Sequence, residues 1–266
     1  MSHASPAPPR SALLGCWASA WLAGDAALAE LVTRVTAEDD RHEVSGLTRD
    51  DLPLGPALGQ LRAAGVTTLR VVLPVPGDVL GLPGPGPFGA AALNASEGLL
   101  ALRADLTGYG LVPTLTVHGS PFDGTVTTVA WTVHAVDAPV VDVGPWLAEA
   151  EHDLRRGLVE ATGVLQALDT ARWRADLAGA LAQLRAQTRA GIDNDELPHG
   201  FSVRARDVLV QARTLAAVLR LATADVGGAL DTRAAVAREQ ALRDLERLVR
   251  RARVAAYNSY GYGRPS

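Results

Sequence analysis

The chain has 266 residues, of which 48% are hydrophobic and 20% charged, with 29 acidic and 25 basic side chains and a formal net charge of −4. A chain of this length can build a full core without metals or disulfides, and its modest acidity argues against a general affinity for nucleic acids or anionic membranes. The single cysteine, Cys16, excludes an intramolecular disulfide framework and a multi-cysteine zinc site, and we predict neither a metal nor a cofactor.

Every one of the 25 basic residues is arginine, and lysine is absent. Ile192 is the only isoleucine, and because Lys and Ile codons are AT-rich, a high-GC coding bias explains both scarcities. Exclusion of surface amines in a protein that meets a lysine-modifying machinery is the alternative explanation. In either case no lysine serves as a Schiff base, a general base or a phosphate ligand.

The N-terminal part of the sequence predicts a leader followed by helices. Residues 1–10 are rich in Pro and Ser and are predicted to be disordered. Segment 11–37 has apolar residues at helical spacing, which indicates one or two helices, with Asp25 as a cap for the second. Segment 38–53 is charged and predicts a loop, and a short helix is expected at 56–64.

The pair Gly15-Cys16 resembles a lipoprotein cleavage site, but the apolar stretch before it is too short for a signal peptide. No run in the sequence reaches the roughly 18 apolar residues of a transmembrane helix. We therefore expect a cytoplasmic protein without a membrane partner.

The middle of the chain changes to a strand pattern. Residues that favour strands fall into separate runs, at 66–73, 99–102, 109–117 and 125–136. In the last run Trp131 belongs to the alternate set of residues that we assign to the core face. Short loops between successive strands predict an antiparallel sheet of three to five strands. The Gly- and Pro-rich segment 81–89 is expected to be a stiff surface loop.

After Gly144-Pro145 the pattern becomes helical, and Ser202 is a predicted N-cap. Strands segregated from helices indicate an α+β fold. We predict an α+β portion at 11–144 with N-terminal helices and the sheet, a portion of three or four helices at 145–256, and a tail at 257–266. The helical portion either packs on the sheet as one domain or stands as a separate bundle.

Polar residues between and on the last two predicted strands form the best catalytic candidate. His118 and Asp123 flank or lie in the loop 118–124, and His134 lies on the following strand. His and Asp are the residue types of acid–base and nucleophilic catalysis. They point to an enzyme, a hydrolase for example, with its site between loops 81–89 and 118–124.

The last predicted helix offers a binding candidate. Four arginines lie close together near its end, at Arg247, Arg250, Arg251 and Arg253, and tyrosines follow them. Arginine with stacking aromatic residues is the composition of a nucleic-acid contact, although acidic residues interleave with the arginines. An acidic protein surface is an equal alternative partner.

The leading functional hypothesis is a non-catalytic interaction, scaffold or accessory protein with a protein partner or a homo-oligomer. It follows from the absence of a catalytic motif and from the long apolar helical stripes. The alternatives are the enzyme just described and a nucleic-acid accessory protein that uses the basic terminal helix.

Overall fold

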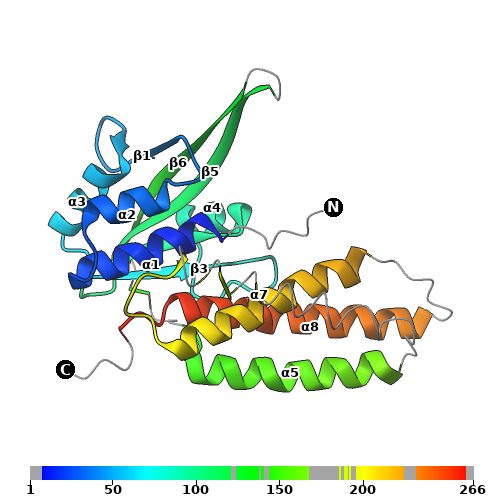
Figure 1. Ribbon diagram of the computed structural model, residues 1–266. Coiled ribbons are helices and arrows are strands. Elements are labelled where there is room, and N and C mark those ends of the chain that lie inside the picture. Colours follow the sequence, from blue (N-terminus) through cyan, green and yellow to red (C-terminus); the bar gives the residue numbers. More distant parts are fainter. Residues whose placement is uncertain are drawn as a thin grey trace. The chain divides into compact units, whose positions relative to one another are not determined.

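The computed structural model describes residues 8–120, 124–137, 139–140, 144–167, 186, 189–190, 192, 196–224 and 232–261. They belong to two compact units (Figure 1). The N-terminal unit contains Pro8–Gly144, Glu196–Phe201 and Tyr260–Ser266, and the helical unit contains Pro145–Asp195 and Ser202–Ser259. The predicted α+β fold class is confirmed, because N-terminal helices and a sheet precede the C-terminal helices along the chain.

The sheet of the N-terminal unit has six strands in the described residues, in the order β2-β1-β6-β5-β4-β3. The strands are β1 (Arg41–Ser45), β2 (Leu52–Pro53), β3 (Thr68–Val72), β4 (Gly98–Leu102), β5 (Gly108–Ser120) and β6 (Gly124–Val136). The last four fall where the sequence predicts strands.

The sheet differs from the predicted three to five antiparallel strands in two respects: the described residues form six strands, and β1 pairs with β6 in parallel. Strands β1 and β2 also lie in segment 38–53, which we predicted to be a loop. The reason is that β1 presents only two buried side chains, His42 and Val44, between exposed or half-buried polar residues. Because one of these two buried residues is a histidine, the segment lacks the alternation of apolar and polar residues from which a strand is predicted.

Three helices of the N-terminal unit precede β3, namely α1 (Arg10–Ala23), α2 (Leu28–Val35) and α3 (Leu54–Ala63). Helix α1 lies against β3, β4 and β5. It approaches the sheet closely at Gly15, where a Cβ atom would meet the side chain of Val71 at 2.7 Å. Helix α2 begins after Ala27 without a side-chain cap, so the prediction that Asp25 caps it was wrong.

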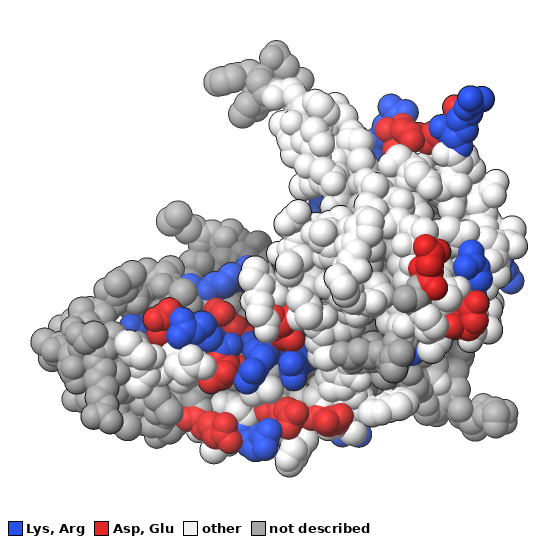
Figure 2. Space-filling model, turned by 180° about the vertical axis from the view of Figure 1, so that it is seen from behind, with Lys and Arg blue, Asp and Glu red and all other residues white. Residues whose placement is uncertain are grey.

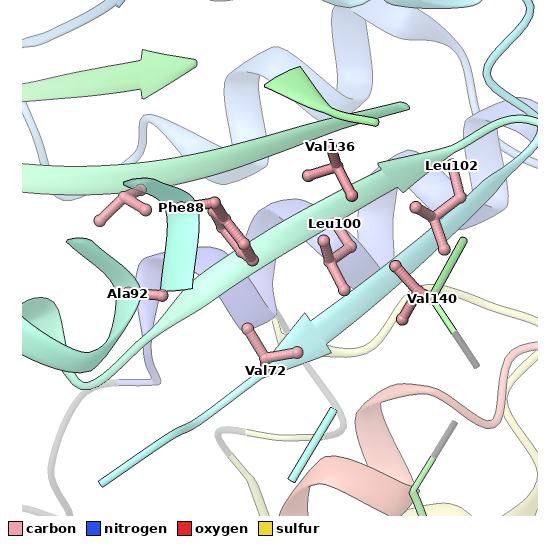
Figure 3. Close-up of a cluster of buried hydrophobic side chains, with 8 residues drawn as sticks. Val72, Phe88, Ala92, Leu100, Leu102, Val136 and Val140 are labelled. Atoms are coloured by element: carbon pink, nitrogen blue, oxygen red, sulfur yellow. The ribbon is translucent and has the colours of Figure 1, made fainter. Parts of the chain in front are cut away.

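The opposite face of the sheet carries an apolar cluster under helix α4 (Pro87–Ala95). Figure 3 shows the cluster, which consists of Val72, Phe88, Ala92, Leu100, Leu102, Val112, Val136 and Val140. Successive strand residues point to opposite faces, so Leu100 belongs here while Leu99 faces α1. The predicted loop 81–89 includes the start of a helix. Pro87 is the first residue of α4, a position where the missing N–H of proline costs no helical hydrogen bond.

The helical unit contains α5 (Leu147–Ala167), α7 (Val203–Ala224) and α8 (Thr232–Tyr257) among the described residues. Helix α8 packs against both α5 and α7. At Gly157 of α5 an added Cβ would lie 2.2 Å from the side chain of Leu248, so glycine permits the close approach of α5 and α8. The predicted cap is confirmed, since the Ala205 N–H donates to Ser202 Oγ at 3.1 Å. No helix of the described residues has the length and apolar character needed to cross a membrane.

Both predicted ends of the folded chain need correction. Helix α1 already begins at Arg10, inside the predicted leader 1–10. Tyr257 is buried and belongs to α8, inside the predicted tail 257–266. Beyond it, the Tyr260 ring lies edge-on to Phe201 at 5.1 Å between centroids, and its hydroxyl donates to an Asp25 carboxylate oxygen.

Candidate functional site

The two histidines predicted to act together lie far apart along the β5–β6 hairpin. His118 is opposite Val126 and His134 is opposite Gly110, so eight residue positions along β6 separate their levels. At about 3.3 Å per residue this corresponds to roughly 26 Å. The structure does not bring them together, and Asp123 lies outside the described residues.

The two loops expected to frame an active site are separated in the same way. Phe88, near the end of segment 81–89, packs on Gly110 and lies 6.5 Å from the His134 ring between centroids. Loop 118–124 is at the other end of the hairpin. A site that uses both loops therefore does not assemble in this arrangement. The described residues also hold no group of three or more His, Cys, Asp or Glu side chains suited to a metal ion.

The predicted arginine cluster lies near the end of α8. Arg247 is exposed and contacts Asp244 at 3.1 Å, whereas the other three, Arg250, Arg251 and Arg253, are half-buried. Nearer the N-terminus of α8, Arg243 pairs with Glu239, as the i,i+4 spacing predicts. Figure 2 shows acidic and basic side chains intermixed on the helical unit. The arrangement resembles a solvated helix face more than a continuous basic surface.

A buried polar network joins three elements of the N-terminal unit and was not predicted. The indole N–H of Trp131 donates to His42 Nδ1 at 3.2 Å, and His42 Nε2 lies 3.1 Å from Asp39 Oδ2. Because an indole nitrogen can only donate, Nδ1 is the acceptor and the proton is on Nε2, which donates to Asp39. The contacts thus fix one neutral tautomer of His42.

The same network continues to the start of α1. Arg10 binds both carboxylate oxygens of Asp39, at 2.7 and 3.0 Å. Burial alone would raise the pKa of Asp39, but hydrogen bonds from Arg10 and His42 outweigh it and lower that pKa. Burial lowers the pKa of His42, which favours the neutral ring. The hydrogen bond with Asp39 is the main cause of the raised pKa of Arg10.

This network links α1, β1 and β6 and presents no reactive group to solvent. The side chains of His42 and Asp39 are only 1% and 3% exposed, and both ring nitrogens of His42 have partners. A second contact secures the same helix end, where Glu97 accepts from both the backbone N–H and the hydroxyl of Ser11, at 2.8 and 2.7 Å. Such a carboxylate satisfies donors that a helix N-terminus leaves open.

Three of the exposed large apolar side chains in the described part of the N-terminal unit lie on the outer part of the β5–β6 hairpin. We call residues 114–119 and 124–127 the hairpin arm. Strands β5 and β6 have 13 residues each, whereas β1 and β4 have 5. The last β4–β5 pair is Leu99 with Leu111, and β1 reaches β6 only from Thr128 inward. In Figure 1 the green hairpin accordingly extends beyond the other elements of its unit.

Burial changes abruptly where the arm begins. Leu111 and Val129, inside the sheet, are 1% and 0% exposed. Leu115, Val117 and Val126, in the arm, are 47%, 57% and 51% exposed. Isolated apolar side chains on a surface are ordinary, but Leu115 and Val117 are neighbours on one face of β5 and form an apolar patch, while Val126, opposite His118, lies on the other face of the arm.

The arm also has no charged side chain in its described residues. The segments are TLTVHG and GTVT, with His118 as the single titratable group. Figure 2 shows the arm as a white projection. Edge strands of soluble proteins are commonly protected by charges, by proline or by a covering element. Here Pro113 lies before the arm, and no strand of the described residues covers β5 beyond Leu111.

The lengths of the predicted strands contain a signal for this arm. The predicted strands at 109–117 and 125–136 are much longer than the predicted strand at 99–102. A strand that outlasts its neighbours must project from the sheet or find another partner. The burial of the inner residues could be predicted from alternation, but the exposure of the outer ones depends on where β1 and β4 end.

Two family descriptions together match most of the chain. Residues 11–146 match the Rv1486c-like protein, N-terminal domain, and residues 148–254 match the Rv1486c-like protein, C-terminal domain. The chain belongs to the Rv1486c-like family.

Similar proteins of the Rv1486c-like family occur in mycobacteria. "Uncharacterized protein Rv1486c" of Mycobacterium tuberculosis is 28% identical over 284 residues, covering 92% of this chain and 95% of the relative. "Uncharacterized protein ML1804" of Mycobacterium leprae is 28% identical, covering 94% and 96%. "Uncharacterized protein MAV321" of Mycobacterium avium is 31% identical over 189 residues, covering 59% and 61%. No solved structure matches the chain.

The relatives named above come from mycobacteria, which are high-GC bacteria. The two Rv1486c-like family descriptions meet between residues 146 and 148. The two structural units separate at nearly the same place, between Gly144 and Pro145.

Proposed function

We propose that this Rv1486c-like protein is a non-catalytic, cytoplasmic interaction protein that binds a protein partner through its hairpin arm. The observation that carries the proposal is the exposed, uncharged ribbon of the hairpin arm, in which Leu115 and Val117 form an apolar patch on one face and Val126 is exposed on the other. Exposed apolar patches of this kind mark interaction sites, and an open strand edge can accept a further strand by backbone pairing.

The arrangement of polar groups supports a binding role over a catalytic one. The buried histidine, His42, has both ring nitrogens engaged and is shielded from solvent. The two strand histidines lie at different levels of the hairpin. By contrast, the arm places neutral side chains and backbone groups where a partner can reach them.

The proposal is tested by purifying the tagged full-length chain from its native host and identifying what remains bound. Leu115→Asp and Val117→Asp place a charge in the apolar ribbon. We expect each to weaken partner retention by about tenfold or more, which corresponds to roughly 1.4 kcal/mol. Val159→Asp is the matched control, because Val159 is 73% exposed on α5, outside the arm.

The control variant should retain the partner at the wild-type level. Equal retention by Val117→Asp and Val159→Asp would refute the assignment of the surface. A wild-type chain that carries no bound protein and does not self-associate would refute the interaction role itself.

A further inference from the structure

We propose that the partner seated on the β5 edge of the hairpin arm is the same edge of a second copy of this chain. The two copies would form a two-fold dimer in which the β5 strands pair antiparallel and join the two sheets. This inference rests on the proposed function, because it assigns an occupant to the same surface.

The direction of the backbone groups follows from contacts at the opposite edge of the hairpin. The carbonyl of Thr127 accepts from the Asp40 N–H at 2.9 Å, so the backbone groups of Thr127 point away from β5. The groups of successive residues alternate in direction, so those of Thr128 point toward β5. Thr128 is opposite Thr116, and the groups of Thr116 therefore point toward β6.

The flanking residues of β5, Leu115 and Val117, then direct their N–H and C=O groups to the outer edge. A separate contact at the base of the hairpin leads to the same assignment of inward- and outward-directed backbone groups. The Arg103 N–H donates to the Thr107 carbonyl at 2.8 Å, so odd-numbered residues of β5 face the β4 side. Beyond Leu111 no strand of the described part of the chain pairs with that side.

This edge is self-complementary about a two-fold axis at Thr116. In that register Leu115 of one copy is opposite Val117 of the other, and each of these residues has both backbone groups directed at its counterpart. The pairing is isologous, since the same residues contribute from both sides. It ends at Pro113, which has no N–H to donate.

The side chains match in the same register. Leu115 and Val117 lie on one face of β5, so the two copies would join four apolar side chains into one patch. Thr114, Thr116 and His118 lie on the other face, where Thr114 is opposite His118 and Thr116 is opposite itself. Apolar side chains thus meet apolar ones and polar side chains meet polar ones.

The charge of the edge favours a second copy over a charged partner. No Asp, Glu or Arg lies between residues 108 and 120. Like charges opposite each other destabilise a strand pair, and a self-pairing edge places every charge against its own sign. An uncharged edge avoids that repulsion, whereas it gives no electrostatic attraction to an acidic or basic peptide.

The first experiment measures the mass of the purified full-length chain by light scattering or sedimentation. We expect twice the 27.8 kDa of the chain at micromolar concentration. Val117→Asp should give the monomer mass, and Val159→Asp should give the dimer mass. A wild-type monomer across the concentration range would overturn the inference.

The second experiment tests the register by cysteine cross-linking. The native Cys16 is fully buried, so an introduced thiol is the accessible one. Thr116→Cys should form a dimer through one disulfide, because residues opposite each other across a non-hydrogen-bonded pair have Cβ atoms about 4.5–5.5 Å apart. Thr114→Cys is the matched control, since it would lie roughly 13 Å from its own copy.

A mixture of two single variants gives the decisive outcome. Thr114→Cys and His118→Cys should each remain uncross-linked alone and should form a mixed disulfide together. Cross-linking of Thr114→Cys with itself, in preference to Thr116→Cys, would overturn the register.

The failure of this inference differs from the failure of the proposed function. A monomeric chain whose arm variants lose a different host protein would overturn self-pairing and leave the interaction role intact. A monomeric chain whose arm variants lose nothing would overturn both.

Discussion

Trp131 shows how a single side chain can fix the protonation of its neighbour. Its indole N–H donates to His42 Nδ1 in the buried interior of the N-terminal unit. Protonation of Nδ1 would set two N–H groups against each other and would place a charge in a site with little solvent. Burial accordingly lowers the pKa of His42, although the hydrogen bond with Asp39 acts in the opposite direction.

This arrangement predicts that the protein loses stability as the pH falls below neutrality. The pKa of His42 is lowered from 6.5 in the folded state, so below about pH 6.5 the unfolded chain binds the proton more readily. The stabilisation is fully present above that value and is lost as the pH falls toward the lowered pKa. The lowered pKa of Asp39 has the same sign, with its loss beginning below about 3.8. The free energy of unfolding should fall by up to about 1.4 kcal/mol per pH unit from His42.

The measurement is urea unfolding, followed by tryptophan fluorescence, at a series of pH values from 7.5 to about 5. His42→Gln removes the titrating group, so its unfolding free energy should be lower at pH 7.5 but flatter with pH. His152→Gln is the control, because His152 is exposed on α5, outside both this network and the hairpin arm. An identical slope in His42→Gln and in the wild type would contradict the assignment.

At the residue scale the sequence predicted the burial of one member of this network. Alternation along 125–136 assigned Trp131 to the core face, and its exposed fraction of 0% confirms that. The partner of its indole could not be found from sequence, because His42 is 89 positions away in a segment without a strand pattern. Hydrogen bonds between distant residues depend on strand order, which local periodicity does not contain.

At the scale of elements, the packing of α4 depends on glycines in the strands beneath it. A Cβ atom at Gly110 would lie 2.1 Å from the Phe88 ring, and one at Gly98 would lie 3.1 Å from it. The aromatic ring therefore sits directly on the backbone of β4 and β5. A helix of nine residues can be anchored in this way even though it is too short to be stable alone.

This contact predicts a coupled pair of substitutions. Gly110→Ala should destabilise the protein by about 1–3 kcal/mol, because the new methyl group displaces the Phe88 ring. Phe88→Ala should cost about 3–5 kcal/mol through lost burial. The double variant should be more stable than the sum of the two losses implies, since the methyl group enters space that the ring has left.

Urea unfolding of the four proteins in this cycle provides the measurement. Gly59→Ala is the control, because Gly59 lies within α3 with nothing within 4 Å of a Cβ atom, and this substitution should be neutral or stabilise by up to about 1 kcal/mol. Strict additivity of Gly110→Ala and Phe88→Ala would show that the contact does not exist.

The elements that sequence reasoning found and missed differ in one physical respect. Strands β4, β5 and β6 have runs of apolar or alternating residues, so each can be predicted from its own sequence without knowledge of the strands beside it. Helix α4 follows a Gly- and Pro-rich stretch and starts at a proline, so the same residues suit a loop and a helix start. Strand β1 pairs in parallel with β6, a long-range choice that short loops between strands do not reveal.

At the scale of the whole molecule, the chain leaves the N-terminal unit and returns to it. Segment 196–201 and Tyr260 belong to that unit although helices of the other unit lie on either side of 196–201 in the sequence. The Tyr260 ring packs on Gly200, where a Cβ atom would lie 2.9 Å from the hydroxyl oxygen. The segregation of strands and helices was readable from periodicity, but this return depends on contacts between residues of opposite chain ends.

The return segments predict a local rather than a global effect of changing Tyr260. Tyr260→Phe removes the hydroxyl that donates to Asp25 and keeps the ring beside Phe201. It should therefore lower the free energy of local opening of the segment around Tyr260 by about 0.5–1.5 kcal/mol. Amide hydrogen exchange at residues 196–201 and 258–261 should accelerate by roughly two- to tenfold, while exchange in the middle of α5 should be unchanged. Tyr109→Phe is the matched control, because it removes a hydroxyl that accepts from Arg103 elsewhere in the same unit. If exchange at 258–261 responds equally to both variants, the Tyr260 contact does not hold the end of the chain; if only Tyr260→Phe accelerates it, a single side chain returns the C-terminal segment to the sheet unit.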